Sequence, residues 1–189
     1  MSTIQKSHQK KMPAKKVITK INKKGEKKIV PRKVFAYPKK HITVAVSGGF
    51  DPVHIGHVRM FNEAKKLGDR LVVILNNDHW LRDKKGQEFM SQNERKEIIE
   101  AFEAVDEVVI TWHSPDYADM SVCRELERIR PHIFANGGDR HAENVPEIAT
   151  CKAINCKMVY NVGAGGKVQS SSSLIKKSND HKERQSRDR

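Results

Sequence analysis

The feature that most constrains the fold is an alternation between short apolar runs rich in β-branched residues and longer amphipathic segments. Five runs have the composition of strands: 42–46, 70–77, 107–112, 132–136 and 156–162. Five segments have the apolar spacing or end signals of helices: 57–68, 93–105, 121–130, 144–155 and 170–177. Alternating strands and helices favour parallel pairing, with helices on both faces. We therefore expect an α/β fold, a Rossmann-like doubly wound parallel five-stranded sheet.

The net charge of +13 is concentrated at one end of the chain. Residues 1–40 carry 14 Lys and Arg and one acidic residue, whereas residues 41–189 carry 22 basic and 22 acidic residues. A lysine-rich segment with few large apolar groups cannot bury enough surface to offset its ordering entropy. We therefore expect a basic, largely disordered arm at 1–40, a folded domain at 41–177 and a disordered polar tail at 178–189. The arm predicts salt-sensitive contact with a polyanion.

Cysteine usage and hydropathy predict a cytoplasmic protein. The three cysteines form no C-x-x-C pair, which is typical of reduced thiols. No apolar run approaches the ~20 residues needed to span a bilayer. No apolar stretch follows the first lysines, as it would in a secretory signal. We expect no transmembrane segment.

Three glycine-rich stretches each follow an expected strand: 47–51, 136–140 and 162–167. The carboxyl ends of parallel strands meet at one edge of a sheet. Ligands of such sheets bind beyond that edge, at the point where the strand order reverses. The three stretches therefore predict a single site.

The first of these stretches, within SGGFDPVHIGH, predicts a triphosphate-binding turn. Gly48 and Gly49 lack a Cβ, so backbone amides can approach a phosphate closely. His54 and His57 lie about one turn apart at the start of a helix, where free N–H groups favour an anion. Two imidazoles can donate hydrogen bonds to charge that develops on a phosphoryl oxygen. A zinc site would need further ligands at local spacing, so we expect no metal held by these histidines.

At this point the sequence resembles a known family. GGFDPVHIGH is similar to the G-x-F-D-x-x-H-x-G-H signature of the cytidylyltransferase-like, HxGH-type nucleotidyltransferases, which include glycerol-3-phosphate cytidylyltransferase and heptose-phosphate adenylyltransferase. Three further segments resemble family motifs in the same order: 76–99, the Gly-Asp turn 136–140, and 167–175. The resemblance covers essentially all of 41–177. One departure is Lys167, which stands near the place where relatives often carry an arginine.

The resemblance implies transfer of a nucleotidyl group from CTP or ATP to a small phosphomonoester, with release of pyrophosphate. The acceptor phosphate would attack the α-phosphorus in line, without a covalent intermediate. Mg²⁺ is expected with the nucleoside triphosphate. Dimers are common in the family, so a homodimer is one expected assembly.

The resemblance also implies roles for named residues. Catalytic roles fall to His54, His57, Lys84 and Arg95. Nucleotide contacts fall to Gly48, Gly49, Phe50, Asp51, Asp139, Ser170, Ser171 and Ser172. Substrate contacts fall to Asp78, Trp80 and Lys85, and either Lys84 or Lys85 matches the lysine that brings charge to the phosphates.

Two alternatives stay open. The motif would also suit a nicotinate or nicotinamide mononucleotide adenylyltransferase, although the lysine-bearing segment before Arg95 and the short span argue against it. The second alternative is a catalytically idle nucleotide- or RNA-binding protein that works through its basic arm, which has only Phe35 and Tyr37 for stacking bases. HIGH also occurs in class I aminoacyl-tRNA synthetases, but this chain lacks room for their domains.

Overall fold

The computed structural model describes residues 18–21, 27–30, 41–115, 118–137, 146–163, 170–175 and 177. The chain divides into two compact units, Met1–Lys39 and Lys40–Arg189. In the first unit, β1 (Ile18–Ile21) and β2 (Lys27–Val30) pair as antiparallel strands. This pairing is not predicted from the sequence. Most of residues 1–40, and all of 178–189, lie outside the described residues, so the disordered arm and tail stay predictions.

The second unit is built on a five-stranded sheet in which every neighbouring pair is parallel. Its strands are β3 (Thr43–Gly48), β4 (Arg70–Leu75), β5 (Glu107–Ile110), β6 (Ile133–Ala135) and β7 (Lys157–Val159). Their order is β5-β4-β3-β6-β7, so the chain first builds outward from β3 through β4 and then returns to its other side at β6. This reversal creates a topological switch point at the carboxyl end of β3. The predicted doubly wound five-stranded parallel sheet is confirmed.

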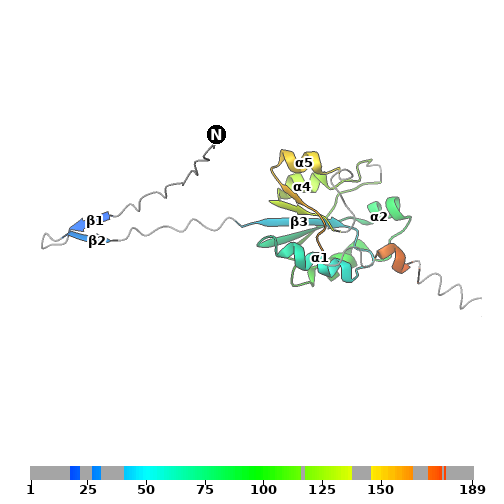
Figure 1. Cartoon of the computed structure of the whole chain (residues 1–189). Helices are drawn as coiled ribbons and strands as arrows, with labels where there is room; N and C mark the ends of the chain where they lie inside the picture. Colours follow the sequence, from blue (N-terminus) through cyan, green and yellow to red (C-terminus); the bar gives the residue numbers. More distant parts are fainter. Residues whose placement is uncertain are drawn as a thin grey trace, which may run out of the picture. The chain divides into compact units, whose positions relative to one another are not determined.

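Helices cover both faces of the sheet. They are α1 (Ile55–Lys65), α2 (Asp78–Lys85), α3 (Gln92–Glu100), α4 (Cys123–Ile129) and α5 (Ile148–Ala153), and residues 171–175 are also helical. Figure 1 shows α4 and α5 on one side of β3 and α1 on the other. Each helix expected from the sequence has a helical counterpart among the described residues, and α1 and α3 begin before their expected starts. One further helix, α2, is not predicted from the sequence, although Asn77 caps its start and Gly86, at a φ of 85°, ends it.

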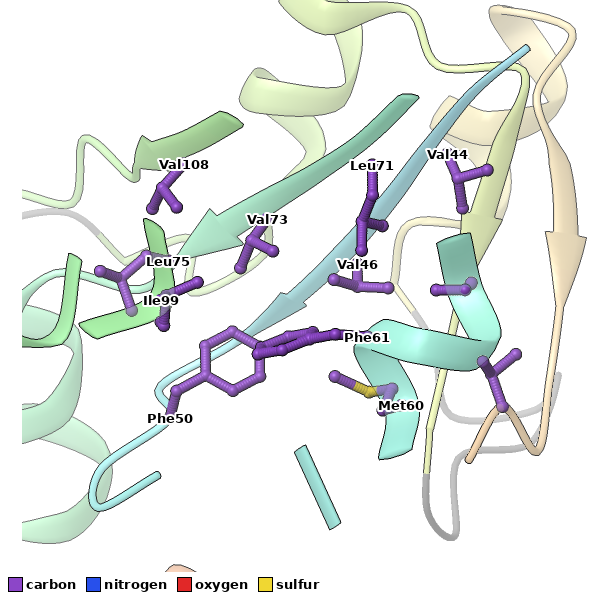
Figure 2. Close-up of a cluster of buried hydrophobic side chains, with 13 residues drawn as sticks. Val44, Val46, Phe50, Met60, Phe61, Leu71, Val73, Leu75, Ile99 and Val108 are labelled. Carbon is purple, nitrogen blue, oxygen red and sulfur yellow. The ribbon is translucent and has the colours of Figure 1, made fainter. Parts of the chain in front are cut away.

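Alternate residues of β3 enter two separate apolar cores. Val44 and Val46 face the core beneath α1 and α3, and Ala45 faces the core beneath α4 and α5. In the first core, the fully buried Phe61 packs against Phe50, with ring centroids 5.2 Å apart (Figure 2). Burial of β3 on both faces explains its continuous apolar sequence.

Phe61 provides a test of this core. Phe61→Ala should lower the free energy of unfolding by about 3–5 kcal/mol, because it removes a fully buried ring that its neighbours cannot replace. Phe89 is 62% exposed, so Phe89→Ala should change the same quantity by no more than about 0.5 kcal/mol. Urea denaturation of both variants measures the difference. Equal losses would contradict the assigned core.

Candidate active site

The site lies at the carboxyl end of the sheet, where segments distant in the sequence meet. The turn that leaves β3 is bonded to β4 by the Asn76 amide, which donates to the Gly48 carbonyl at 2.9 Å. The same turn contacts the last helix, because the Ser171 hydroxyl donates to the Pro52 carbonyl at 2.9 Å. After β7, the Gly163 amide donates to the Glu63 carboxylate of α1 at 2.9 Å. The first glycine turn and the serine motif therefore lie together.

The two histidines of the turn form a reciprocal capping box at the start of α1. His54 is the N-cap residue, and its Nδ1 accepts from the Gly56 amide at 3.1 Å. His57 stands at the third helical position, and its Nδ1 accepts from the His54 amide at 3.3 Å. The two imidazoles stack with centroids 3.7 Å apart. Both rings thus satisfy backbone donors that the first turn of a helix leaves unpaired.

This arrangement determines which ring nitrogen carries the proton. A neutral imidazole whose Nδ1 accepts a hydrogen bond holds its proton on Nε2. Burial, followed by the nearby His54 and Lys85, lowers the pKa of His57 to about 3. Burial and Lys85 also lower the pKa of His54, against its own backbone hydrogen bond. Both rings are therefore neutral at pH 7, and neither Nε2–H group has a hydrogen-bond partner among the described residues.

The residues around the pair hold it in place. A Cβ on Gly56 would lie 3.0 Å from the His54 ring, so only glycine leaves that ring room to reach the helix amide. Phe50, at a φ of 50°, meets His57 edge to face with centroids 4.9 Å apart. Phe50 is buried in the core, so it anchors the histidines to the sheet.

Lys85 approaches the histidines, and Lys84 does not. The Lys85 ammonium lies 3.4 Å from the Asp51 carbonyl oxygen, and its charge acts on both imidazoles. Loss of hydration lowers the pKa of Lys85, against the carboxylate of Asp51. Both lysines are exposed, but Lys84 makes no hydrogen bond or ion pair with the described residues. Of the two predicted lysines, the structure brings Lys85 to the site.

Asp51 is buried and holds a loop. Its two carboxylate oxygens accept from the amides of Phe89, at 2.6 Å, and Met90, at 2.9 Å. These bonds tie the glycine turn to the segment before α3. The carboxylate therefore holds the turn in place, and its contact with the nucleotide stays a prediction.

Arg95 is fully buried and ties four segments together. Its Nη1 donates to the carbonyls of Gly49 and Asn76, both at 2.7 Å. Its Nη2 donates to the Asp78 carboxylate at 2.6 Å, and its Nε donates to the Met90 carbonyl at 3.0 Å. A buried charge is tolerated when it is paired and hydrogen-bonded in this way. Asp78, a predicted substrate contact, and Arg95, a predicted catalytic residue, thus bind each other.

The remaining predicted contact residues are in α2, in the glycine turn, in the serine motif and in a segment that is not described. The Trp80 indole donates to the Met120 carbonyl at 2.8 Å, and a Cβ on Gly49 would lie 2.8 Å from Leu81, so α2 packs closely on the turn. In the serine motif, Ser170 begins the last helix by accepting from the Ser173 amide at 3.2 Å, while Ser172 is exposed. Asp139 and Lys167 lie outside the described residues.

Two asparagines that sequence reasoning missed flank the switch point. Asn76 follows β4 and Asn136 follows β6, and each is 3% exposed. Asn76 Oδ1 and Asn136 Nδ2 have no hydrogen-bond partner within the described part of the chain. Buried polar groups are normally paired, so each is a candidate ligand contact. The signal in the sequence was an asparagine directly after a buried strand.

No group of three His, Cys, Asp or Glu side chains able to hold a metal ion occurs among the residues that the structure describes. None of the described helices has the length and apolar character needed to cross a bilayer.

A doubly wound parallel sheet with paired neutral imidazoles at the helix after its central strand defines a nucleotide-binding α/β protein. Residues 45–178 match the cytidylyltransferase-like family model, so the chain belongs to that family. It is a nucleotidyltransferase, and the family and enzyme class predicted from the sequence are confirmed.

Named relatives agree with this assignment. The FAD synthase of Thermococcus kodakarensis is 36% identical over 124 residues, which are 64% of this chain and 80% of the relative. The bifunctional protein HldE of Koribacter versatilis is 35% identical over 98 residues, which are 51% of this chain but 19% of that relative. The crystal structure of the lipopolysaccharide core biosynthesis protein from Thermoplasma volcanium has a TM-score of 0.54 and 27% identity, covering 65% of this chain and 98% of that one.

The capping box predicts how His57 titrates. Nuclear magnetic resonance of its ring nitrogens should show the Nε2–H tautomer at pH 7 and no protonation above about pH 4, because the pKa is lowered to about 3. Unfolded His57 takes up a proton near pH 6.5, so the folded state should lose stability as the pH falls from 6.5 towards 3, by up to about 1.4 kcal/mol per pH unit.

A matched variant isolates this effect. His57→Asn keeps an acceptor for the His54 amide but cannot be protonated, so its stability should fall less steeply over the same pH range. His41→Asn, at an exposed position, should follow the wild-type curve. A midpoint near pH 6.5 for the His57 ring would contradict its lowered pKa, and a proton on Nδ1 at pH 7 would contradict the assigned tautomer.

Arg95 should be required for folding. Arg95→Met should lower the free energy of unfolding by about 3–5 kcal/mol, because three carbonyls and the Asp78 carboxylate lose a buried donor. Arg59→Met, at an exposed position, should change it by no more than about 0.5 kcal/mol. Unchanged stability together with lost activity would assign Arg95 to the substrate instead.

Proposed function

We propose that this protein transfers a nucleotidyl group from ATP or CTP to a small phosphomonoester. An oxygen of the acceptor phosphate forms a bond to the α-phosphorus of the nucleotide. The bond from that phosphorus to the bridging oxygen breaks on the opposite side, and pyrophosphate leaves with the electron pair. No residue of the protein forms a covalent bond to the nucleotide at any stage.

The observation that carries this proposal is the stacked pair of imidazoles, whose Nδ1 atoms accept from backbone amides and whose Nε2 atoms have no hydrogen-bond partner in the described part of the chain. Negative charge grows on the oxygens around the α-phosphorus in the transition state. Donors held in place before the reaction stabilise that charge without reorganising. Since both Nδ1 atoms are bonded to backbone amides, the rings cannot turn away without breaking the start of α1.

Lys85 supports the same step as a nearby positive charge. Its ammonium lies beside the glycine turn, and its lowered pKa reflects partial loss of hydration. A cation held beside the turn attracts the oxygens of a phosphate bound there. We therefore assign the phosphate-binding role to Lys85 rather than Lys84.

Asn76 and Asn136 extend the proposed site on either side of β3. The nucleotide would offer an acceptor to Asn136 Nδ2 and a donor to Asn76 Oδ1, which lack partners in the described structure. We propose that Ser170–Ser172, at the start of the last helix, lie near the β- and γ-phosphates.

Mg²⁺ enters this proposal as part of the nucleotide substrate. Both oxygens of the Asp51 carboxylate already accept from backbone amides, so Asp51 is poorly suited to bind an ion. Mg²⁺ in such enzymes is held largely by phosphates and water. The ion would neutralise charge on the leaving pyrophosphate.

Residues 1–40 carry a separate proposal. Their 14 basic residues against one acidic residue support salt-sensitive contact with a polyanion, independent of turnover. The homodimer and the cytoplasmic location stay predictions.

Pyrophosphate release by the full chain, with four nucleoside triphosphates and a panel of phosphomonoesters, tests the main proposal. His54→Ala and His57→Ala should each lower kcat by about 10²-fold or more. Lys85→Ala should lower turnover far more than Lys84→Ala, and Lys66→Ala, at the exposed end of α1, should leave it unchanged.

The outcomes separate the alternatives. Turnover restricted to nicotinate or nicotinamide mononucleotide would select that adenylyltransferase class. Tight RNA binding without turnover of any nucleotide would select the idle binding protein. Histidine variants with wild-type turnover and a wild-type fold would contradict the proposed mechanism.

A further inference from the structure

A pocket of about 440 Å³ lies at the carboxyl ends of β4 and β5, on the α2 side of the active site. Its walls come from residues 110–115, from the start of α2 and from Gln92 of α3. This volume is in the range of small-molecule sites. On the basis of the proposed function, we propose that this pocket holds the body of the acceptor, and that this body is a planar aromatic heterocycle rather than a sugar or polyol.

Trp112 supplies the surface on which such a ring would stack. It lines the pocket and is 68% exposed. The Arg124 guanidinium carbon lies 4.7 Å from the centroid of the indole, so a cation restrains the ring while most of its surface stays open. Ile110 and Pro115 add apolar wall beside it. An exposed indole in a pocket is suited to offset stacking with another aromatic ring.

Most polar groups of the lining are already used within the protein. The Thr111 hydroxyl accepts from the Asn77 amide at 3.0 Å and contacts His113 Nδ1 at 2.8 Å. His113 Nε2 contacts the Ser121 carbonyl at 2.9 Å. The Asn77 side chain donates to the His113 carbonyl at 2.6 Å and accepts from the Trp80 amide at 2.9 Å. These groups shape the pocket but have little capacity left for a ligand.

The remaining polar capacity is small. Among the residues that the structure describes, no Asp, Glu, Lys or Arg lines this pocket. In the same residues, the His79 ring and the Ser114 hydroxyl make no hydrogen bond, and Gln92 uses only its Oε1, which accepts from the Asp78 amide at 3.1 Å. A sugar or polyol carries a hydroxyl on nearly every carbon, and few of these hydroxyls would find a direct partner in this lining. A heterocycle with a few polar edge atoms matches the His79, Ser114 and Gln92 side chains better.

The pocket is also connected to the proposed site of phosphate chemistry. Asp78 donates to Gln92 through its amide and accepts from Arg95, which in turn donates to the Gly49 carbonyl. β5 and β3 are two strands apart, which is roughly 10 Å at the usual strand spacing. The acceptor should therefore carry a short spacer between its ring and its phosphate.

Binding to the full chain tests this inference. The probes are flavin mononucleotide and nicotinamide mononucleotide, which have a ring, and ribose 5-phosphate and glycerol 3-phosphate, which have none. Calorimetry is run with and without non-hydrolysable ATP and CTP analogues. At least one ring-bearing probe should bind, and Trp112→Leu should weaken its binding by about 10-fold or more. Trp112→Phe should keep the affinity within about 3-fold, since it preserves a stacking surface.

Phe89→Leu is the matched control, because Phe89 is an exposed aromatic residue that does not line the pocket. It should leave the affinity of the ring-bearing probe unchanged, and the preferred probe identifies the size of the ring. The inference is overturned if neither ring-bearing probe binds, if a ring-free probe binds more tightly, or if Trp112→Leu has no more effect than Phe89→Leu. Ring binding that depends on Trp112 without pyrophosphate release would refute the proposed function and leave the inference standing.

Discussion

The reciprocal hydrogen bonds between His54, His57 and the backbone of α1 are the interaction on which the site depends. A capping box needs acceptors at the N-cap and at the third helical position, which is the spacing of the two histidines. Gly56 between them leaves room for the first ring. The same bonds that begin the helix consume both Nδ1 atoms and leave both Nε2–H groups for a ligand. The start of the helix and the proposed chemistry therefore need the same two histidines at the same spacing.

Arg95 is a second residue that holds the segments of the site in position. It joins the ends of β3 and β4 to α2 and to the segment before α3, all through hydrogen bonds of a fully buried guanidinium. Its position explains why α2 packs against the glycine turn, and so why Lys85 reaches Asp51. One buried cation thus aligns the histidine side of the site with the pocket of Trp112. A lysine could not replace it, because a single ammonium lacks the fork of donors that reaches separate acceptors.

Much of the fold could be predicted from the sequence, because the apolar runs and cap residues act locally. The five strands and their parallel pairing are examples. The helix α2 was missed because its polar sequence has no apolar periodicity, although its Asn77 cap was visible. Within the site, the histidine pair could be located from its motif. The choice between Lys84 and Lys85 could not, since adjacent residues of a helix point in different directions.

The sequence alone determined the class of sheet, the position of the glycine turn with its two histidines, and the family, because each depends on residues close together in the chain. Only the tertiary structure decided that Arg95 is buried, that Asp51 holds a loop and that Trp112 stands open over a pocket. Those outcomes depend on which groups from distant segments satisfy one another's hydrogen bonds. Such pairing is a property of the packed chain, and a local pattern of residues does not contain it.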